Sequence, residues 1–266
     1  MEKNEKIRKI ICVFIACCML TCMTGTSVSA TNYEKYSSKK ICWYIVNQKN
    51  HIKPPGAESS KVLKKFNAYY CDTSTHKKVM YLAFDCGYEN GYTGKILDIL
   101  KKNNVKATFF VTKQFVETNA KLCKRMKKEG HLVGNHTMNH PSMPSKSPSD
   151  IRREVKGLES IFKKKTGYKL DKFIRPPMGE YSHRVLKLLK DMGYTTILWS
   201  MAYNDYNPAN QPGKKFVVNY FKKHYHKGAI TLTHNVSKSN KDALNDVIKY
   251  LKKKKYKMKL LTELHK

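Results

Sequence analysis

Short apolar runs alternate with longer amphipathic stretches from Val79 to the end of the chain. The runs are rich in β-branched and aromatic residues, whereas the stretches between them carry apolar residues at helical spacing. The predicted strands cover residues 79–85, 107–112, 131–135, 172–175, 195–201, 229–234 and 258–261. The predicted helices cover residues 93–103, 119–129, 148–166, 182–192, 214–227 and 240–256. This strict alternation predicts an α/β protein with a parallel sheet, either open and doubly wound or rolled into a barrel.

Residues 1–30 have the pattern of a secretory signal. Basic residues precede an uncharged apolar stretch over residues 10–23, and small residues follow as far as Ala30. The stretch is short for a membrane span, yet no charge follows until Glu34, so an uncleaved N-terminal anchor is the alternative. We therefore expect an exported protein, located in the cell wall or on the outer face of a membrane. The expected organisation is a signal or anchor over 1–30, an extended or weakly helical appendage over 31–75, and the main domain over 76–266.

The charge of the chain indicates an anionic partner. Fifty-two Lys and Arg residues against 20 Asp and Glu give a net charge of +32. Nucleic acid, anionic lipid and an anionic wall polymer would all suit this charge. Because export makes nucleic acid an improbable partner, we expect an anionic cell-wall polymer and no nucleic acid.

Cysteine usage does not define a disulfide framework. Four of the eight cysteines lie in the first 30 residues, and the remaining Cys42, Cys71, Cys86 and Cys123 form no CxxC pair. A domain of this size does not need disulfides, so no pairing is assigned.

Polar residues stand where several predicted strands end. In a parallel sheet or barrel the carboxyl ends of the strands share one rim, where the functional loops lie. The rim residues expected from the sequence are Asp85, His136, Arg175, Asp205 and His234. A structural role in packing could explain any one of these residues, but it explains less easily why all of them gather at one rim.

His136 and His140 are four residues apart, a spacing that on a helical turn directs both imidazoles to one side. The spacing alone is a weak signal, but its place after a strand, on the rim that receives Asp85 and His234, favours a metal site. Arg175 next to Asp85 would keep that carboxylate ionised and able to accept a proton from an activated water.

These residues resemble the five ordered motifs of the polysaccharide deacetylases with NodB homology, carbohydrate esterase family 4. The resemblance covers about residues 76–264. The motif positions are Phe84-Asp85-Cys86-Gly87, His136 to His140, Arg175-Pro176-Pro177-Met178-Gly179, Asp205-Tyr206 and Leu232-Thr233-His234. Residues 81–93, together with Trp43-Tyr44 and Pro54-Pro55, look like the delta-lactam-biosynthetic de-N-acetylases, which act on spore-cortex peptidoglycan.

The resemblance implies a distorted (β/α)7 barrel of the NodB-homology type and a role for each motif. Asp85 would be the general base, positioned by Arg175, and His136 and His140 would be metal ligands. His234 would be the acid, tuned by Asp205. The oxyanion and substrate positions would be the backbone N–H of Met178, with Pro176 in the same segment, and Tyr206 as an aromatic wall.

Two positions depart from the family pattern. Tyr206 stands where the family usually has Trp, which keeps an aromatic wall but adds a hydroxyl. Cys86 stands where most members have an Asp as third metal ligand. Either its thiolate binds the ion, or the ion keeps only two protein ligands and binds weakly, or the site tolerates several divalent metals.

The implied function is metal-dependent N-deacetylation of N-acetylmuramic acid whose stem peptide has been removed. The freed amine can then close on the lactyl carboxylate to give muramic δ-lactam, a reaction of sporulation in the forespore intermembrane space. Zn²⁺ is the expected ion, with Co²⁺ or Mn²⁺ as alternatives, and the glycan strand of peptidoglycan is the expected partner. The alternatives are a deacetylase of another acetylated glycan and an inactive wall-binding protein. Oligomeric state and the lactam-closing catalyst stay open.

Overall fold

The computed structural model describes residues 32–264, and the chain from Tyr33 onward forms one compact unit. The predicted signal or anchor over residues 1–30 lies outside the described residues. Among the residues described, no helix is both long and apolar enough to cross a bilayer.

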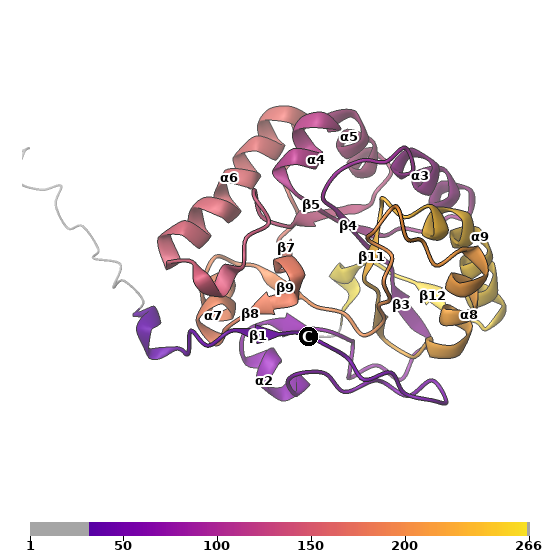
Figure 1. Ribbon diagram of the computed structural model, residues 1–266, viewed down its shortest axis with the longest axis horizontal. Helices are drawn as coiled ribbons and strands as arrows, with labels where there is room; N and C mark the ends of the chain where they lie inside the picture. Colours follow the sequence, from indigo (N-terminus) through magenta and orange to yellow (C-terminus); the bar gives the residue numbers. More distant parts are fainter. Residues whose placement is uncertain (1–31, 265–266) are drawn as a thin grey trace, which may run out of the picture. The chain divides into compact units, whose positions relative to one another are not determined.

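The main sheet has seven strands, all parallel, and its order brings segments distant in sequence next to one another (Figure 1). In spatial order these are β11 (Thr233–His234), β4 (Ala83–Cys86), β5 (Thr108–Val111), β6 (Leu132–Asn135), β7 (Phe173–Ile174), β9 (Thr195–Ile197) and β2 (Ala68–Tyr69). A second parallel ladder consists of β10 (Ala229–Ile230), β3 (Val79–Tyr81) and β12 (Lys257–Met258). The curled sheet and its helices form the distorted (β/α)7 barrel expected from the sequence.

Two predicted strands are each divided in two. Residues 79–85 form β3 and β4, and residues 229–234 form β10 and β11. Between the two ladders, the hydroxyl of Thr231 accepts a hydrogen bond from the Ala83 N–H at 2.9 Å, and the hydroxyl of Thr233 donates to the Ala83 carbonyl at 2.8 Å. Side chains thus replace backbone pairing where the sheet changes direction.

The six predicted helices are all present, with ends shifted by a few residues. They lie outside the strands, with α8 and α9 packed side by side (Figure 1). Their bounds are α3 Thr93–Lys102, α5 Ala120–Lys128, α6 Pro148–Thr166, α7 His183–Asp191, α8 Lys214–His224 and α9 Lys238–Lys253. Helix α6 has the residues that mark helix ends in a sequence. Ser147 caps its first turn, Pro148 follows, and Gly167 ends the helix with a φ of 82°.

Several short elements were not predicted. Helix α4 begins where the hydroxyl oxygen of Thr112 accepts from the Phe115 N–H. The unpredicted elements are α2 (Ser60–Lys65), α4 (Lys113–Thr118), β1 (Ile41–Cys42), β2, β8 (Glu180–Tyr181) and the single turns Tyr33–Lys35, Met143–Ser145, Pro177–Gly179 and Leu261–Glu263.

From Tyr33 onward, the segment before residue 76 belongs to the same compact unit as the rest of the chain. Strand β2 extends the main sheet beyond β9, and β1 pairs antiparallel with β8. The indole N–H of Trp43 donates to the Trp199 carbonyl at 2.9 Å. Its ring also lies against Gly56, where a Cβ atom would stand 2.2 Å from the ring. The segment therefore covers an otherwise exposed sheet edge.

Gly134 on β6 faces a part of the barrel interior that has no room for a side chain. A Cβ atom there would lie 2.8 Å from both the Phe110 ring and the Phe173 carbonyl oxygen. We expect Gly134→Ala to lower the free energy of unfolding by about 1–3 kcal/mol, because a backbone atom and a packed ring cannot both move away. Chemical denaturation measures the change. Gly94→Ala is the matched control, since its nearest contact would be Leu122 at 3.9 Å; equal stability of the two variants would contradict this packing argument.

Candidate active site

Three of the predicted rim residues, Asp85, His136 and His234, line one cavity of about 460 Å³. The other two, Arg175 and Asp205, are fully buried and contact Asp85 and His234. Side chains from the ends of β4, β6 and β11 meet there with residues that follow β7 and β9. The lining consists of Asp85, Gly87, Tyr88, His136, His140, Met178, Gly179, Trp199, Tyr206, Leu232, His234, Asn235 and Val236.

Asp85, at the end of β4, forms a buried ion pair with Arg175. Oδ1 of Asp85 accepts from a terminal guanidinium N–H at 2.7 Å. Arg175 is fully buried, and three further N–H groups donate to the carbonyls of Ile197, Leu198 and Thr231. Burial by itself would raise the pKa of Asp85. The charge of Arg175, together with the charges of His136 and His234 and the hydrogen bond from Arg175, outweighs this effect and holds the pKa below its usual value. Asp85 is therefore a carboxylate at neutral pH.

His136 is held in one orientation by the backbone of Arg175. Its Nδ1 lies 2.8 Å from the Arg175 carbonyl oxygen, to which only a protonated Nδ1 can donate. Nε2 then carries the free lone pair, and it lies 3.6 Å from Oδ2 of Asp85. Burial lowers the pKa of His136 to about 4, so the ring is neutral at pH 7. A neutral imidazole with a fixed tautomer is the form that binds a metal ion.

The rings of His136 and His140 lie together, with centroids 4.8 Å apart and planes at 72°. A loop and not the helical turn inferred from the spacing brings them together, because Thr137 and His140 have φ values of 66° and 53°. Oδ1 of Asn135 accepts from the Thr137 N–H at 2.8 Å, and the Thr137 hydroxyl oxygen accepts from the His140 N–H at 3.1 Å. These two hydrogen bonds stabilise the left-handed turn that aligns the imidazoles.

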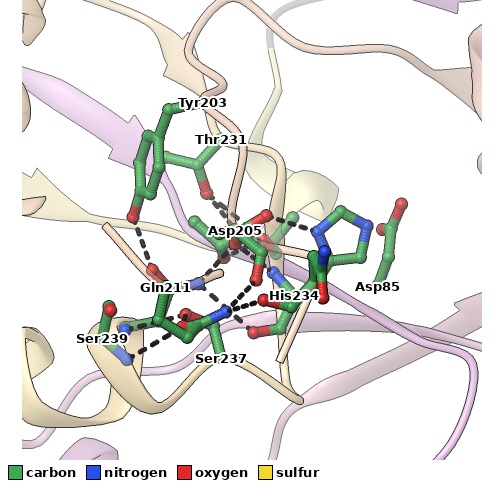
Figure 2. Close-up of polar contacts among 12 residues, drawn as sticks. Asp85, Tyr203, Asp205, Gln211, Thr231, His234, Ser237 and Ser239 are labelled. Atoms are coloured by element: carbon green, nitrogen blue, oxygen red, sulfur yellow. Dashed lines mark hydrogen bonds and ion pairs between the residues drawn. The ribbon is translucent and has the colours of Figure 1, made fainter. Parts of the chain in front are cut away.

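His234, at the end of β11, is bound on two sides by Asp205 (Figure 2). Its Nδ1 lies 2.6 Å from Oδ1 of Asp205, and its backbone N–H donates to Oδ2 at 2.7 Å. Burial would lower the pKa of His234, but the hydrogen bond and charge of Asp205, with the charge of Asp85, outweigh this effect and raise the pKa. The amide of Asn240 on α9 also donates to Asp205. Asn240 was missed in the sequence because it lies within a helix, with no strand end to mark it.

The Arg175-to-Gly179 segment presents Met178 to the cavity. Met178 has a φ of 57°, unusual for a residue with a side chain, and its side chain is exposed. Tyr206 lines the cavity with its ring centroid 6.0 Å from that of His234. Pro176 is buried and does not line the cavity, contrary to its expected substrate position; its carbonyl accepts from the Gly179 N–H at 3.1 Å and so shapes the turn.

Cys86 faces away from the histidines, which favours a site with two protein ligands over ligation by the Cys86 thiolate. Successive residues of a strand point to opposite faces, and Asp85 takes the cavity face. Cys86 is fully buried in the apolar cluster that includes Phe84 and Val111, where burial raises its thiol pKa well above the usual value. Across residues 32–264, no group of three or more His, Cys, Asp or Glu side chains is arranged to hold an ion. Cys42, Cys71, Cys86 and Cys123 are all free thiols.

Sequence reasoning did not single out Trp199, Tyr88 or Asn235 as site residues. Asn235 directly follows His234, and its amide donates to the Tyr88 carbonyl at 2.8 Å and to the Thr93 hydroxyl at 2.9 Å. It thereby joins the loop after β4 to the loop after β11. The position of Asn235 at a strand end could have marked it as a site residue. Nothing in the sequence marked Trp199, because an aromatic residue in a strand-like run normally indicates core.

The orientation of Cys86 predicts how metal binding responds to substitution. We expect Cys86→Ala to leave zinc affinity unchanged while costing about 1 kcal/mol of stability, because it removes only core packing. His140→Ala is the matched variant and should weaken zinc binding by about tenfold or more. Calorimetric titration with ZnCl₂ measures both. A loss of zinc affinity in Cys86→Ala would show that the thiol reaches the ion.

Comparison with known proteins agrees with this geometry. Residues 72–197 match the family model described as polysaccharide deacetylase. The chain is 40% identical over 249 residues to the peptidoglycan-N-acetylmuramic acid deacetylase PdaA of Bacillus subtilis, covering 93% of each protein. It is 33% identical to a peptidoglycan-N-acetylglucosamine deacetylase of Bacillus cereus, covering 73% of this chain and 91% of that protein. The solved structure of Bacillus subtilis PdaA, described as a family 4 carbohydrate esterase, superposes with a TM-score of 0.82 at 42% identity, over 86% of this chain and 97% of that one. The chain belongs to the polysaccharide deacetylase family.

Proposed function

We propose that this protein is an exported, metal-dependent peptidoglycan deacetylase that removes the acetyl group from N-acetylmuramic acid. The observation that carries the proposal is the meeting, in one cavity, of an ionised carboxylate, a neutral imidazole pair and a histidine held by a second carboxylate. Amide hydrolysis requires a base for the attacking water, a stabiliser for the oxyanion and an acid for the leaving amine.

His136 and His140 fit a divalent cation. Their imidazoles are adjacent, and the hydrogen bond from His136 to the Arg175 carbonyl leaves Nε2 free to bind an ion. Nitrogen donors with a carboxylate nearby suit Zn²⁺, and also Co²⁺ or Mn²⁺. When bound, such an ion would supply an acidified water and polarise the acetamide carbonyl. With two histidines as protein ligands, we expect a weakly held and exchangeable metal.

Asp85 is the group that accepts the proton of the attacking water. The buried Arg175 holds its carboxylate both ionised and fixed in position, since one of its oxygens is hydrogen-bonded to the guanidinium. The other oxygen, Oδ2, faces His136. Arg175 is a positioning residue because it acts through Asp85.

Met178 and His234 complete the reaction. The left-handed turn at Met178 places its backbone at the cavity, where the N–H would donate to the developing oxyanion. Asp205 raises the pKa of His234 and so favours its protonated form, which would transfer a proton to the leaving nitrogen. Acetate and a free amine on the sugar are the products.

The choice of substrate rests on similarity to the Bacillus subtilis deacetylase across nearly the whole chain. The substrate would be muramic acid without its stem peptide, whose freed amine can close on the lactyl carboxylate to give a δ-lactam. A role in sporulation, in the forespore intermembrane space, follows from that product. The net charge of +32 suits attachment to an anionic wall polymer.

Comparison of three glycans tests the proposal. Purified protein with Zn²⁺, Co²⁺ or Mn²⁺ should release acetate from stem-free muramyl glycan and much less from peptide-bearing muramyl glycan or N-acetylglucosamine oligomers. Release from the N-acetylglucosamine oligomers alone would indicate the activity named for the Bacillus cereus relative. Release from none, with any metal, would indicate a wall-binding protein. Asp85→Asn is the control, with turnover expected to fall by about 10²–10⁴-fold; its stability falls too, because Arg175 then lies buried without a counter-charge.

The Asp205–His234 pair predicts the pH range of turnover. Asp205→Asn removes the charge that raises the pKa of His234, while the burial that lowers it stays. The pKa of His234 should then fall below 6.5, and the protonated acid is lost at a lower pH. We expect the alkaline limb of the kcat/KM profile to move to lower pH, in parallel with the His234 titration followed by NMR. An unchanged alkaline limb would assign the acid to another group.

A further inference from the structure

A second groove of about 500 Å³ adjoins the catalytic cavity. The two share Gly87, Tyr88 and His140 as walls, so a ligand seated at the histidines extends directly into the groove. The catalytic cavity is mainly apolar apart from its reacting groups, whereas this groove has polar walls contributed by α4 and by the loop that carries His140.

Lys113, the first residue of α4, lies in the wall of this groove and is half-buried. Among residues 32–264 it forms no ion pair and no side-chain hydrogen bond. Glu117, one helical turn later, also lines the groove and is exposed, yet the two charges do not pair. A cation in a concave polar site without a protein counter-ion is available for an anionic group of a ligand.

The chemistry of the proposed substrate supplies such an anion next to the reacting bond. In N-acetylmuramic acid the acetamide is on C2, and the lactyl ether that ends in a carboxylate is on the adjacent carbon, C3. An acetamide placed at His140 therefore has its lactyl group beside it. N-acetylglucosamine has only a hydroxyl at C3, and a muramic acid that bears a stem peptide has a neutral amide in place of the carboxylate.

We propose that Lys113 is the specificity-determining residue for the free lactyl carboxylate, which it binds in this groove. The inference rests on the proposed function and adds the group that recognises the substrate. The side-chain amide of Gln114 lines the same groove, as does Asn139, which has one amide hydrogen besides the one donated to Glu154. Either can donate to the second carboxylate oxygen. Loss of the carboxylate, by peptide attachment or by its absence in glucosamine, removes the ion pair.

Binding in the presence of EDTA, which prevents metal-dependent turnover, tests this inference. Calorimetry compares stem-free muramyl glycan with the same glycan methylated on its lactyl carboxylates. The purified protein should bind the free acid about five- to tenfold more tightly than the ester, as expected for a partly buried charged hydrogen bond. Lys113→Met should abolish the preference and Lys113→Arg should retain it. The ratio of the two affinities, free acid over ester, should also fall at high salt.

Controls separate this inference from the proposed function. Lys121→Met removes an exposed lysine from α5 and should leave the preference intact. Glu117→Gln should increase the preference for the free acid, because it removes a negative charge that repels the lactyl carboxylate.

Thermal denaturation confirms that Lys113→Met is folded, with Lys113→Gln as a second neutral variant. No preference in the unaltered protein, no measurable binding of either glycan, or a preference that survives in Lys113→Met overturns the role of Lys113. Failure of the proposed function would appear instead as no acetate release by the metal-loaded protein, with the binding preference intact.

Discussion

The buried ion pair between Arg175 and Asp85 is the interaction on which the site depends. The guanidinium is fully buried and donates hydrogen bonds to Asp85 and to three backbone carbonyls, which come from the last residue of β9 and the residues directly after β9 and β10. The same residue provides, through its own carbonyl, the acceptor that fixes the tautomer of His136. One arginine therefore sets the charge of the base, the orientation of an imidazole and the spacing of the strands around them. A charge so deeply buried is tolerated only with its counter-ion in place.

The second half of the site is built around Asp205 by the same principle. Asp205 is completely buried, and its two oxygens accept from the ring and backbone of His234 and from Asn240. The two carboxylates thus have distinct environments. Asp85 is paired with a permanent cation and stays ionised, whereas Asp205 is paired with a histidine and raises its proton affinity. This division produces a base and an acid at the same pH.

The region before residue 76 shows how a part distant from the chemistry supports it. Trp43 donates to the Trp199 carbonyl, and Trp199 lines the cavity. The Cβ of Trp43 also lies close to Gly179, where an added Cβ would stand 3.2 Å from it. Strand β1 pairs with β8, directly after the turn that carries Met178. The N-terminal segment therefore holds the turn proposed to bind the oxyanion against the barrel.

The sequence by itself determined the alternation of strands and helices, the rim on which the functional residues stand, and the ionisable groups found there. Hydrophobic periodicity and strand ends are local properties of the chain, so they could be read without coordinates. The tertiary structure alone decided three things: that Cys86 points into the core, that a left-handed loop and not a helix pairs His136 with His140, and that residues 33–75 complete the sheet. Each of these depends on which face of a strand a neighbour occupies or on a contact between segments far apart in the chain. Residue spacing cannot encode such a choice, because the same spacing is compatible with either face and with several backbone paths.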